Sequence, residues 1–417
     1  MKLGLWVLAA LVLGIGLGAW IDHLQTPALV QAAGGVSVLG ALWLDALRMT
    51  IVPLILAVLV TAIAQMAETA AVGPLARRAL LLFAGLIIAA GIYSLLATHA
   101  AFALWPISAS SAQGLIAAAG PAPESAGALD LAAWAQSLVP TNIVAAAAED
   151  AVLPVVVFAC VFGLAVTQLP PDQRRPLAGF FQAVSAAMIV IVQWVLLLAP
   201  LGVFGLSVSL GLTAGFETLG VLAQYVVIVS GVTIGVILIA LVLGLAFSGV
   251  EPGRFLRGAG PVMVIAASTQ SSLASLPAML TAAMGPLGVR PAIAEFVLPL
   301  AVAVFRMTSP VANLAVVAFL VHLYGVDVSL WQWAAALAVA FAVSVSSVGL
   351  PGQTSFFASI APICVTLGLP VTLLPLLLAV EVIPDVFRTI GNVTADLSAT
   401  TILNRVKTPR AETATAP

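Results

Sequence analysis

Five polar residues near the C-terminal end of the chain are spaced so that one helix would bring them together. Glu381, Asp385, Arg388, Asn392 and Asp396 follow one another at intervals of 4, 3, 4 and 4 residues. At 3.6 residues per turn they fall within an arc of about 80°. A planar guanidinium binds a carboxylate through two parallel hydrogen bonds, and a carboxylate can neutralise an ammonium group or a metal cation. This stripe therefore has the chemistry to bind a small charged solute.

The composition places this helix in a membrane. Of 417 residues, 62% are hydrophobic and 7% are charged, which is far from the usage of soluble globular proteins. Apolar runs long enough to cross about 30 Å of hydrocarbon recur along the chain. We therefore predict an all-α polytopic membrane protein whose main partner is the lipid bilayer. The net charge of −2 and the lack of a basic patch give no indication of nucleic-acid binding.

Eight membrane-spanning helices and two irregular helical hairpins fit the hydropathy pattern. The first six spans are expected at 3–21, 40–66, 78–105, 140–168, 176–210 and 218–248. Two irregular apolar stretches follow, at 258–285 and 331–370, and each leads into a further span, at 291–322 and 371–403 respectively.

The basic residues outside the spans support this layout, because they fall on one side only. They are Lys2, Arg77, Arg78, Arg174, Arg175, Arg254, Arg257, Arg290, Arg405, Lys407 and Arg410. The loops assigned to the other side, 107–135, 211–217, 323–330 and 366–370, contain no Lys or Arg. Positively charged loops stay in the cytoplasm, so both termini are predicted to be cytoplasmic. We expect the inner membrane of a bacterial-type cell, with residues 3–20 as the first span rather than a signal peptide.

The two irregular stretches carry small, polar and helix-breaking residues. Residues 267–277 read ASTQSSLASLP, and residues 346–355 read SSVGLPGQTS. Non-helical backbone is not tolerated in lipid, so each tip must be buried in protein or line a wet cavity. Broken helices expose N–H groups and dipole ends, which bind anions and ions. Two such stretches, each followed by a span with polar residues, indicate an internal repeat with a site between its halves. The alternative is a pair of kinked helices packed through small residues.

Three basic residues, Arg48, Arg306 and Arg388, lie within predicted spans. A charge there costs about a few kcal/mol or more unless it is paired or hydrated. Arg48 follows Asp45 by three residues and is interpreted as part of a structural ion pair or as a snorkelling residue. Arg306 and Arg388, which accompany the irregular stretches, are candidates for function.

Three short segments carry a resemblance to a known family: TQSSLASLP at 269–277, VGLPG at 348–352 and RTIGNVTAD at 388–396. They resemble the tips of the two re-entrant hairpins and the last-helix signature of the dicarboxylate/amino acid:cation symporters. This family contains excitatory amino acid transporters and bacterial glutamate and C4-dicarboxylate carriers. Weaker matches at 47–54, 139–143 and 199–204 extend the resemblance over nearly the whole chain.

The resemblance implies a homotrimer of eight-span subunits built on inverted repeats. Each subunit would contain a scaffold and a mobile transport domain that moves across the membrane like an elevator. The scaffold would comprise 1–75 and 107–213, the transport domain 76–106 and 214–404, and the cytoplasmic tail 405–417.

The resemblance also implies roles for individual residues. Arg388 would pair with a carboxylate of the solute, and Asp385 would receive its amino group. Further substrate contacts would come from Thr389, Asn392, Ser271, Ser272, Val348, Gly349, Leu350, Pro351 and Gly352. C4-dicarboxylate carriers of the family lack an Asp at the position of Asp385, so an acidic amino acid is favoured as substrate.

One segment departs from the family pattern. Where the family has Asn-Met-Asp-Gly-Thr, which helps to bind sodium, this chain reads FRMTSP over 305–310. Our hypothesis is that Arg306 pairs with Asp396 and replaces at least one sodium ion. In the alternative, Arg306 snorkels or pairs elsewhere, with Glu381 or Glu295 as candidate partners, and a sodium site remains. The cation site or its replacement is assigned to Asp396, Arg306 and Asn392. Na⁺ and H⁺ both stay open as coupling ions, and no other cofactor or metal is expected.

Together these features predict a secondary active transporter, a symporter or exchanger, for a small carboxylate-bearing solute. The alternatives are a C4-dicarboxylate carrier with proton coupling or without sodium, and an anion-conducting channel that uses Arg388. An intramembrane hydrolase with Ser271 or Ser272 as nucleophile is disfavoured, because no His or Lys stands near either serine in the sequence. We therefore expect no catalytic residue.

Overall fold

A computed structural model describes residues 2–24, 26–50, 73–108, 139–149, 152–214, 217–346 and 352–405, with scattered positions between 52 and 64 and between 112 and 116. Every labelled element in these ranges is an α-helix. The helices are α1 (Lys2–Leu24), α2 (Pro27–Arg48), α4 (Pro74–Leu104), α7 (Ile143–Ala148), α8 (Val152–Thr167), α9 (Pro171–Leu197), α10 (Ala199–Ala214), α11 (Glu217–Phe247), α12 (Pro252–Thr269), α13 (Ser272–Met284), α14 (Pro291–Val304), α15 (Thr308–Tyr324), α16 (Leu330–Ser346), α17 (Gly352–Thr366), α18 (Leu374–Val380) and α19 (Val382–Arg405).

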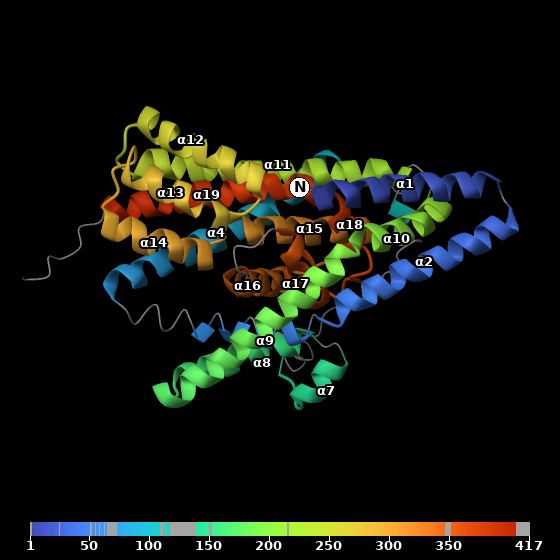
Figure 1. Ribbon diagram of the computed structural model, residues 1–417, viewed down its shortest axis with the longest axis horizontal. Coiled ribbons are helices and arrows are strands. Elements are labelled where there is room, and N and C mark those ends of the chain that lie inside the picture. Colours follow the sequence, from blue (N-terminus) through green and yellow to red (C-terminus); the bar gives the residue numbers. More distant parts are fainter. Residues whose placement is uncertain are drawn as a thin grey trace, which may run out of the picture.

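Most of the helices form two groups that follow one another along the long axis of the molecule, and α7, α8 and α9 lie below them in Figure 1. Figure 1 shows α11 to α15, α19 and α4 together on the left, and α1, α2 and α10 extending to the right. Within the left-hand group α19 packs against α11, α12 and α14, and α4 packs against α15. Helices α12 and α13 pack on each other as a pair, as do α16 and α17. These two pairs coincide with the two irregular stretches of the sequence.

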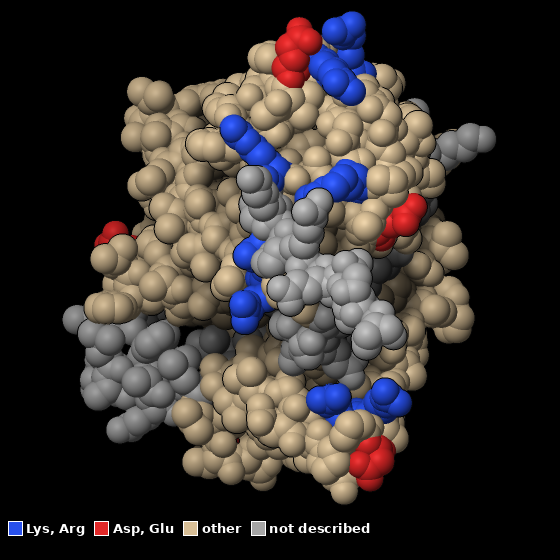
Figure 2. Space-filling model, turned by 90° about the vertical axis from the view of Figure 1, so that its left-hand side faces the viewer, with Lys and Arg blue, Asp and Glu red and all other residues tan. Residues whose placement is uncertain are grey.

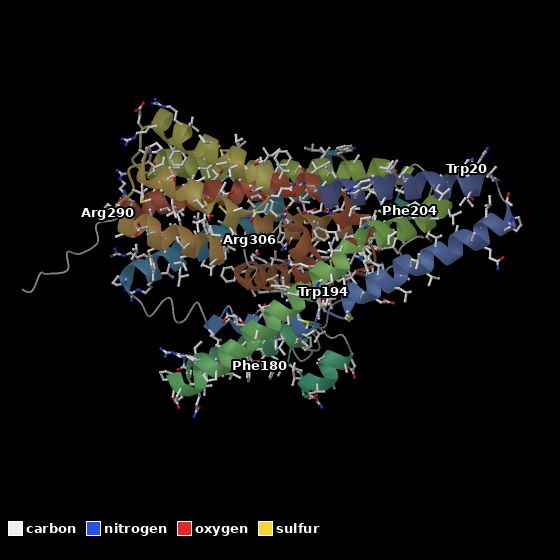
Figure 3. The ribbon with its side chains drawn as sticks, in the orientation of Figure 1. Trp20, Phe180, Trp194, Phe204, Arg290 and Arg306 are labelled. Atoms are coloured by element: carbon white, nitrogen blue, oxygen red, sulfur yellow. The ribbon has the colours of Figure 1, made fainter. Side chains whose placement is uncertain are left out.

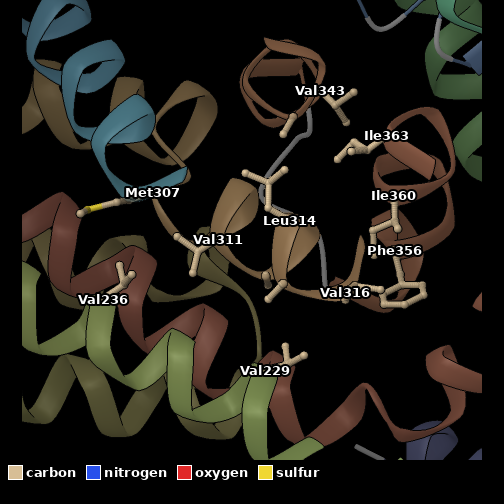
Figure 4. Close-up of a cluster of buried hydrophobic side chains, with 14 of the residues drawn as sticks. Val229, Val236, Met307, Val311, Leu314, Val316, Val343, Phe356, Ile360 and Ile363 are labelled. Carbon is tan, nitrogen blue, oxygen red and sulfur yellow. The ribbon is translucent and has the colours of Figure 1, made fainter. Parts of the chain in front are cut away.

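Helix α15 forms the centre of the hydrophobic core. Every residue from Thr308 to Leu320 is buried, and a helix that is apolar on all sides belongs in the interior. Its Val311, Leu314 and Val316 meet valines of α11 and aromatic and aliphatic side chains of α17 (Figure 4). The start of this helix therefore has a fixed position deep inside the protein.

Glycines allow α10 to contact α1 and α2 backbone to backbone. A Cβ on Gly211 of α10 would collide with the carbonyl oxygen of Ile15 in α1. A Cβ on Gly205 would lie 2.8 Å from the nitrogen of Gly40 in α2, which is closer than any stable contact. Small residues at helix interfaces permit this approach in membrane proteins, where close van der Waals packing contributes to helix association. These three helices therefore form one tightly packed unit.

Within the described residues, five helical segments are long and apolar enough to cross a membrane. They are Pro27–Ala46, Pro74–Leu104, Pro171–Leu197, Leu219–Phe247 and Pro291–Tyr324. The prediction of a helical membrane protein is therefore confirmed, whereas the number of eight spans remains a prediction. The expected span at 40–66 was placed wrongly at its start, because α2 begins at Pro27 and ends at Arg48.

Three predicted spans are interrupted, and each interruption has a proline close behind it. A proline lacks the N–H for an intrahelical hydrogen bond, and its ring clashes with the carbonyl four residues earlier. Pro200 accounts for the end of α9 at Leu197, in the middle of the expected span 176–210. Pro310 and Pro384 each stand third in their helices, α15 and α19. They follow the breaks at residues 305–307 and at Glu381, so Arg306 and Glu381 both sit at helix junctions.

Exposed arginines gather at one end of the molecule. Helices α4, α9, α12 and α14 begin at this end and α19 finishes there (Figure 1), and Figure 2 shows many Lys and Arg side chains on it with fewer acidic ones. The exposed members of this group are Arg77, Arg78, Arg175, Arg254, Arg257, Arg290 and Arg405. The beginning of α1 lies nearer the middle of the molecule (Figure 1).

Candidate functional site

The polar stripe predicted from the sequence lies on α19 and is buried. Arg388 is 2% exposed, Asp385 1% and Asp396 0%, and Thr389 and Asn392 are buried beside them. Helix α19 reaches this position because α11, α12, α14 and α15 surround it. Arg306 joins the stripe from the junction between α14 and α15 and lies in the interior, whereas Arg290 lies at the arginine-rich end (Figure 3).

Arg388 forms an ion pair with Glu381. Its Nη2 atom lies 2.9 Å from Oε1 of Glu381, and both side chains are almost completely buried. The hydroxyl of Tyr225 on α11 donates a hydrogen bond of 2.9 Å to Oε2 of the same carboxylate. Glu381 is therefore held between a guanidinium on one oxygen and a phenol on the other. A buried charge is tolerated only when it is compensated in this way.

Thr308, the first residue of α15, fixes the backbone and side chains of α19. Its hydroxyl lies 2.8 Å from both the carbonyl oxygen of Arg388 and Oδ1 of Asn392. Its backbone N–H donates to Oδ1 of Asn392 at 3.1 Å. The Asn392 amide therefore satisfies an N–H at the start of α15, as a capping residue would. Gly391 makes this approach possible, since a Cβ there would collide with the Thr308 methyl group.

The tip of the α12–α13 pair contacts the start of α19. Gln270 has a left-handed backbone conformation, with φ of 52°, and its amide donates to the carbonyl oxygen of Val382 at 3.1 Å. Ser271 caps α13 by accepting from Ala274 N at 3.3 Å, and Ser272 is buried in the first turn. A non-glycine residue in this conformation costs about 1 kcal/mol, which the surrounding contacts must offset. The structure thus brings the first predicted tip to the polar stripe.

The second predicted tip lies mostly outside the described residues. Val348, Gly349, Leu350 and Pro351 belong to the undescribed segment 347–351, and Gly352 is the first residue of α17. Helix α17 packs against α15, α16 and α19.

Arg306 and Asp396 face each other without a hydrogen bond between them. Neither carboxylate oxygen of Asp396 accepts a hydrogen bond from the part of the chain that the structure describes, although Arg306 interacts electrostatically with it. The guanidinium of Arg306 faces Arg388 and Asp385 as well. The hypothesis that Arg306 pairs with Asp396 in place of a sodium ion therefore stays a prediction, and the guanidinium also interacts with Asp385 and Arg388.

The cluster contains more acidic than basic groups. Glu381, Asp385 and Asp396 face two guanidinium groups, those of Arg306 and Arg388. Charges in a buried site interact far more strongly than in water. Among the described side chains of this cluster there is therefore no spare positive charge with which to neutralise an additional carboxylate.

The sequence did not identify Tyr225 or Thr308 as part of the site. It also did not predict the ion pair between Glu381 and Arg388. The 3.6-residue period does place Glu381 and Arg388 on one face, seven residues apart. Tyr225 is the single tyrosine of α11, a mainly apolar helix, and a buried tyrosine hydroxyl usually finds a partner. No sequence signal identified Thr308, because its contact depends on the packing of α15 on α19.

Comparison with known sequences supplies the family. Residues 3–406 match the sodium:dicarboxylate symporter family. The chain is 26% identical over 405 residues to the proton/glutamate-aspartate symporter of Escherichia coli (strain K12). This alignment covers 95% of the present chain and 91% of the symporter. It is 26% identical over 416 residues to a proton/sodium-glutamate symport protein of Bacillus caldotenax, covering 97% and 94%. It is also 28% identical over 441 residues to the human neutral amino acid transporter B(0), covering 94% and 78%.

The family match includes every residue of the buried polar cluster and both helix pairs. The resemblance noted from short motifs is therefore confirmed, and the family consists of transporters rather than enzymes. On this match, the chain belongs to the sodium:dicarboxylate symporter family.

Proposed function

We propose that this protein is a secondary active transporter that carries an acidic amino acid across a membrane together with a coupling cation. The observation that carries the proposal is the burial of two opposite charges close together on one helix. Arg388 and Asp385 lie three residues apart on α19 and are both within the protein interior. An acidic amino acid presents a side-chain carboxylate to the first and an ammonium group to the second.

The relatives support the substrate class. Two of them are described as symporters of glutamate, or of glutamate and aspartate, and a third as a neutral amino acid transporter. Both of these bacterial relatives are named as proton symporters, and the name of one also includes sodium. Coupling to H⁺ or Na⁺ is therefore the natural expectation for this chain.

The layout of the helices supports a two-part subunit of the kind the family resemblance implies. Helices α1, α2 and α10 pack into one unit, and α4 and α11 to α19 form the part that contains the polar cluster. We propose that the first belongs to a static scaffold and the second to a mobile transport domain, with α12–α13 and α16–α17 as re-entrant hairpins. The arginine-rich end would face the cytoplasm of a bacterial-type cell. A homotrimer is the proposed assembly.

Uptake into proteoliposomes tests the proposed function. Radiolabelled aspartate, glutamate and succinate would be offered to the purified protein under imposed proton and sodium gradients. We expect saturable uptake of an acidic amino acid. Steady anion currents without saturable uptake would contradict the proposal and favour a channel.

Two substitutions test the assigned contacts. Arg388→Ala is expected to abolish binding of dicarboxylic solutes, because a carboxylate would be left in a dry site without its counter-charge. Asp385→Asn is expected to weaken amino-acid binding and to spare succinate, which has no ammonium group. Equal losses for aspartate and succinate in Asp385→Asn would show that Asp385 does not bind the ammonium group.

A further inference from the structure

The guanidinium proposed to bind the substrate already holds a carboxylate. Arg388 Nη2 lies 2.9 Å from Glu381 Oε1, so Glu381 occupies the position that a substrate carboxylate would take. This inference rests on the proposed function, in which Arg388 is the carboxylate ligand. A substrate must displace Glu381 from Arg388 or share the guanidinium with it.

Sharing the guanidinium between two ionised carboxylates is electrostatically unfavourable. The cluster already has three acidic and two basic side chains, and like charges in a buried site repel strongly. An acidic amino acid adds one further net negative charge. One positive charge must therefore enter the site for each substrate molecule that binds.

We propose that this positive charge is a proton taken up by Glu381. When the substrate carboxylate reaches Arg388, the contact between Nη2 and Oε1 breaks and a proton from the adjacent aqueous phase binds to Oε1. Oε2 keeps its hydrogen bond from Tyr225. When the substrate leaves, the proton leaves and Glu381 returns to Arg388. One proton thus accompanies each substrate molecule. In the empty carrier, the carboxylate of Glu381 occupies the guanidinium of Arg388.

The surroundings of Glu381 fit this assignment. Among the described side chains, the titratable groups facing it are Tyr225 from α11 and Arg388 and Asp385 from α19. Arg306 lies beyond them and faces Arg388 and Asp385. Helices α1, α10 and α17 also pack against α18. Helices α10 and α17 contain no Lys, Arg, His, Asp or Glu, and those of α1 are Lys2, Asp22 and His23, at its two ends.

Asp396 is a less suitable proton acceptor for this step. It makes no ion pair with Arg388 and lies eight residues, or about 12 Å, further along α19. Substrate binding at Arg388 therefore does not displace it from a partner.

Calorimetric titration of the purified protein with aspartate tests the proposal. Repeating the titration in buffers of different ionisation enthalpy gives the number of protons taken up per substrate. We expect about one proton, and a Kd that rises about tenfold per pH unit above the transition. A Kd that is independent of pH, or that depends on Na⁺ against choline instead, overturns the proposal. Absence of any aspartate binding overturns the proposed function together with this inference.

Three variants assign the proton to its residue. Glu381→Gln mimics the protonated acid, so aspartate should bind without proton uptake and with the same Kd at every pH. Glu381→Asp retains an acid and should restore proton uptake. Glu295→Gln makes the same chemical change at an exposed position on α14 and should behave like the unmodified protein. Proton uptake that persists in Glu381→Gln assigns the proton to another group and overturns the proposal. If that variant does not fold, the dependence of Kd on pH in the unmodified protein tests the proposal instead.

Discussion

Replacing Tyr225 by Phe should improve substrate binding at high pH. The substitution removes one oxygen, whose hydrogen bond of 2.9 Å supports Oε2 of Glu381. A hydrogen bond to a charged group contributes about 1.5–3 kcal/mol, and one to a neutral group about 0.5–1.5 kcal/mol. The empty carrier with ionised Glu381 therefore loses about 1–1.5 kcal/mol more than the substrate-bound carrier with protonated Glu381.

The sign of this difference favours binding. Because the empty state is destabilised more than the bound state, Kd for aspartate should fall by about five- to tenfold at pH values where Glu381 is ionised in the empty carrier. At low pH, where Glu381 is already protonated before substrate arrives, the substitution should give no gain. The steep part of the profile of Kd against pH therefore moves by about one unit to higher pH.

The measurement is a series of aspartate titrations from about pH 5 to about pH 9 on the variant and the unmodified protein. Tyr93→Phe is the matched control, since it removes the same atom from α4, where the hydroxyl packs over Gly235 rather than against a carboxylate. Weaker binding of aspartate by Tyr225→Phe at high pH would refute the reasoning. An equal displacement of the profile in Tyr93→Phe would do the same.

Two further predictions concern packing and orientation. Gly391→Ala should destabilise the protein by about 1–3 kcal/mol, because the new methyl group collides with Thr308 at the contact of α15 with α19. Thermal unfolding measures this loss. Gly260→Ala is the control, since a methyl group at Gly260 would meet no neighbouring atom. In a background without the two native cysteines, Asp327→Cys should react with an impermeant maleimide added outside, and Arg175→Cys only with reagent supplied inside. The reverse pattern would show that the proposed orientation in the membrane is wrong.

The sequence identified the polar stripe correctly but not the contacts that it makes. The order of Glu381, Asp385, Arg388, Asn392 and Asp396 on one helix face followed from the helical period alone. The ion pair of Arg388 with Glu381 forms at the junction of α18 and α19, where Glu381 keeps helical dihedral angles and its carbonyl oxygen accepts a hydrogen bond from Asp385 N. Periodicity gives the face of a residue and leaves its distance across a junction undetermined.

The helix breaks inside the predicted spans did not follow from the hydropathy pattern. Hydropathy treats 176–210 and 291–322 as continuous, since Pro200 and Pro310 change the mean apolar character very little. Their effect is on a single backbone hydrogen bond and on ring sterics, which a window average does not register. The start of α2 at Pro27 was missed for a related reason, because Gln31, Gly34 and Gly35 lower the hydropathy of its first turns.

The glycine contacts of α10 have a mechanical consequence. Where backbones touch, no side chain can change rotamer to absorb a slide, so α1, α2 and α10 should be stiff against shear. The Gly391–Thr308 contact stiffens α15 against α19 in the same way.

Helix α18 lies between these two stiff bodies. It contacts α1 and α10 on one side and α11, α17 and α19 on the other, and its seven residues are all apolar. Movement along such a surface exchanges one apolar contact for another and breaks no side-chain hydrogen bond of α18. The friction opposing a displacement of the polar cluster relative to α1 and α10 should therefore be lowest along this short helix.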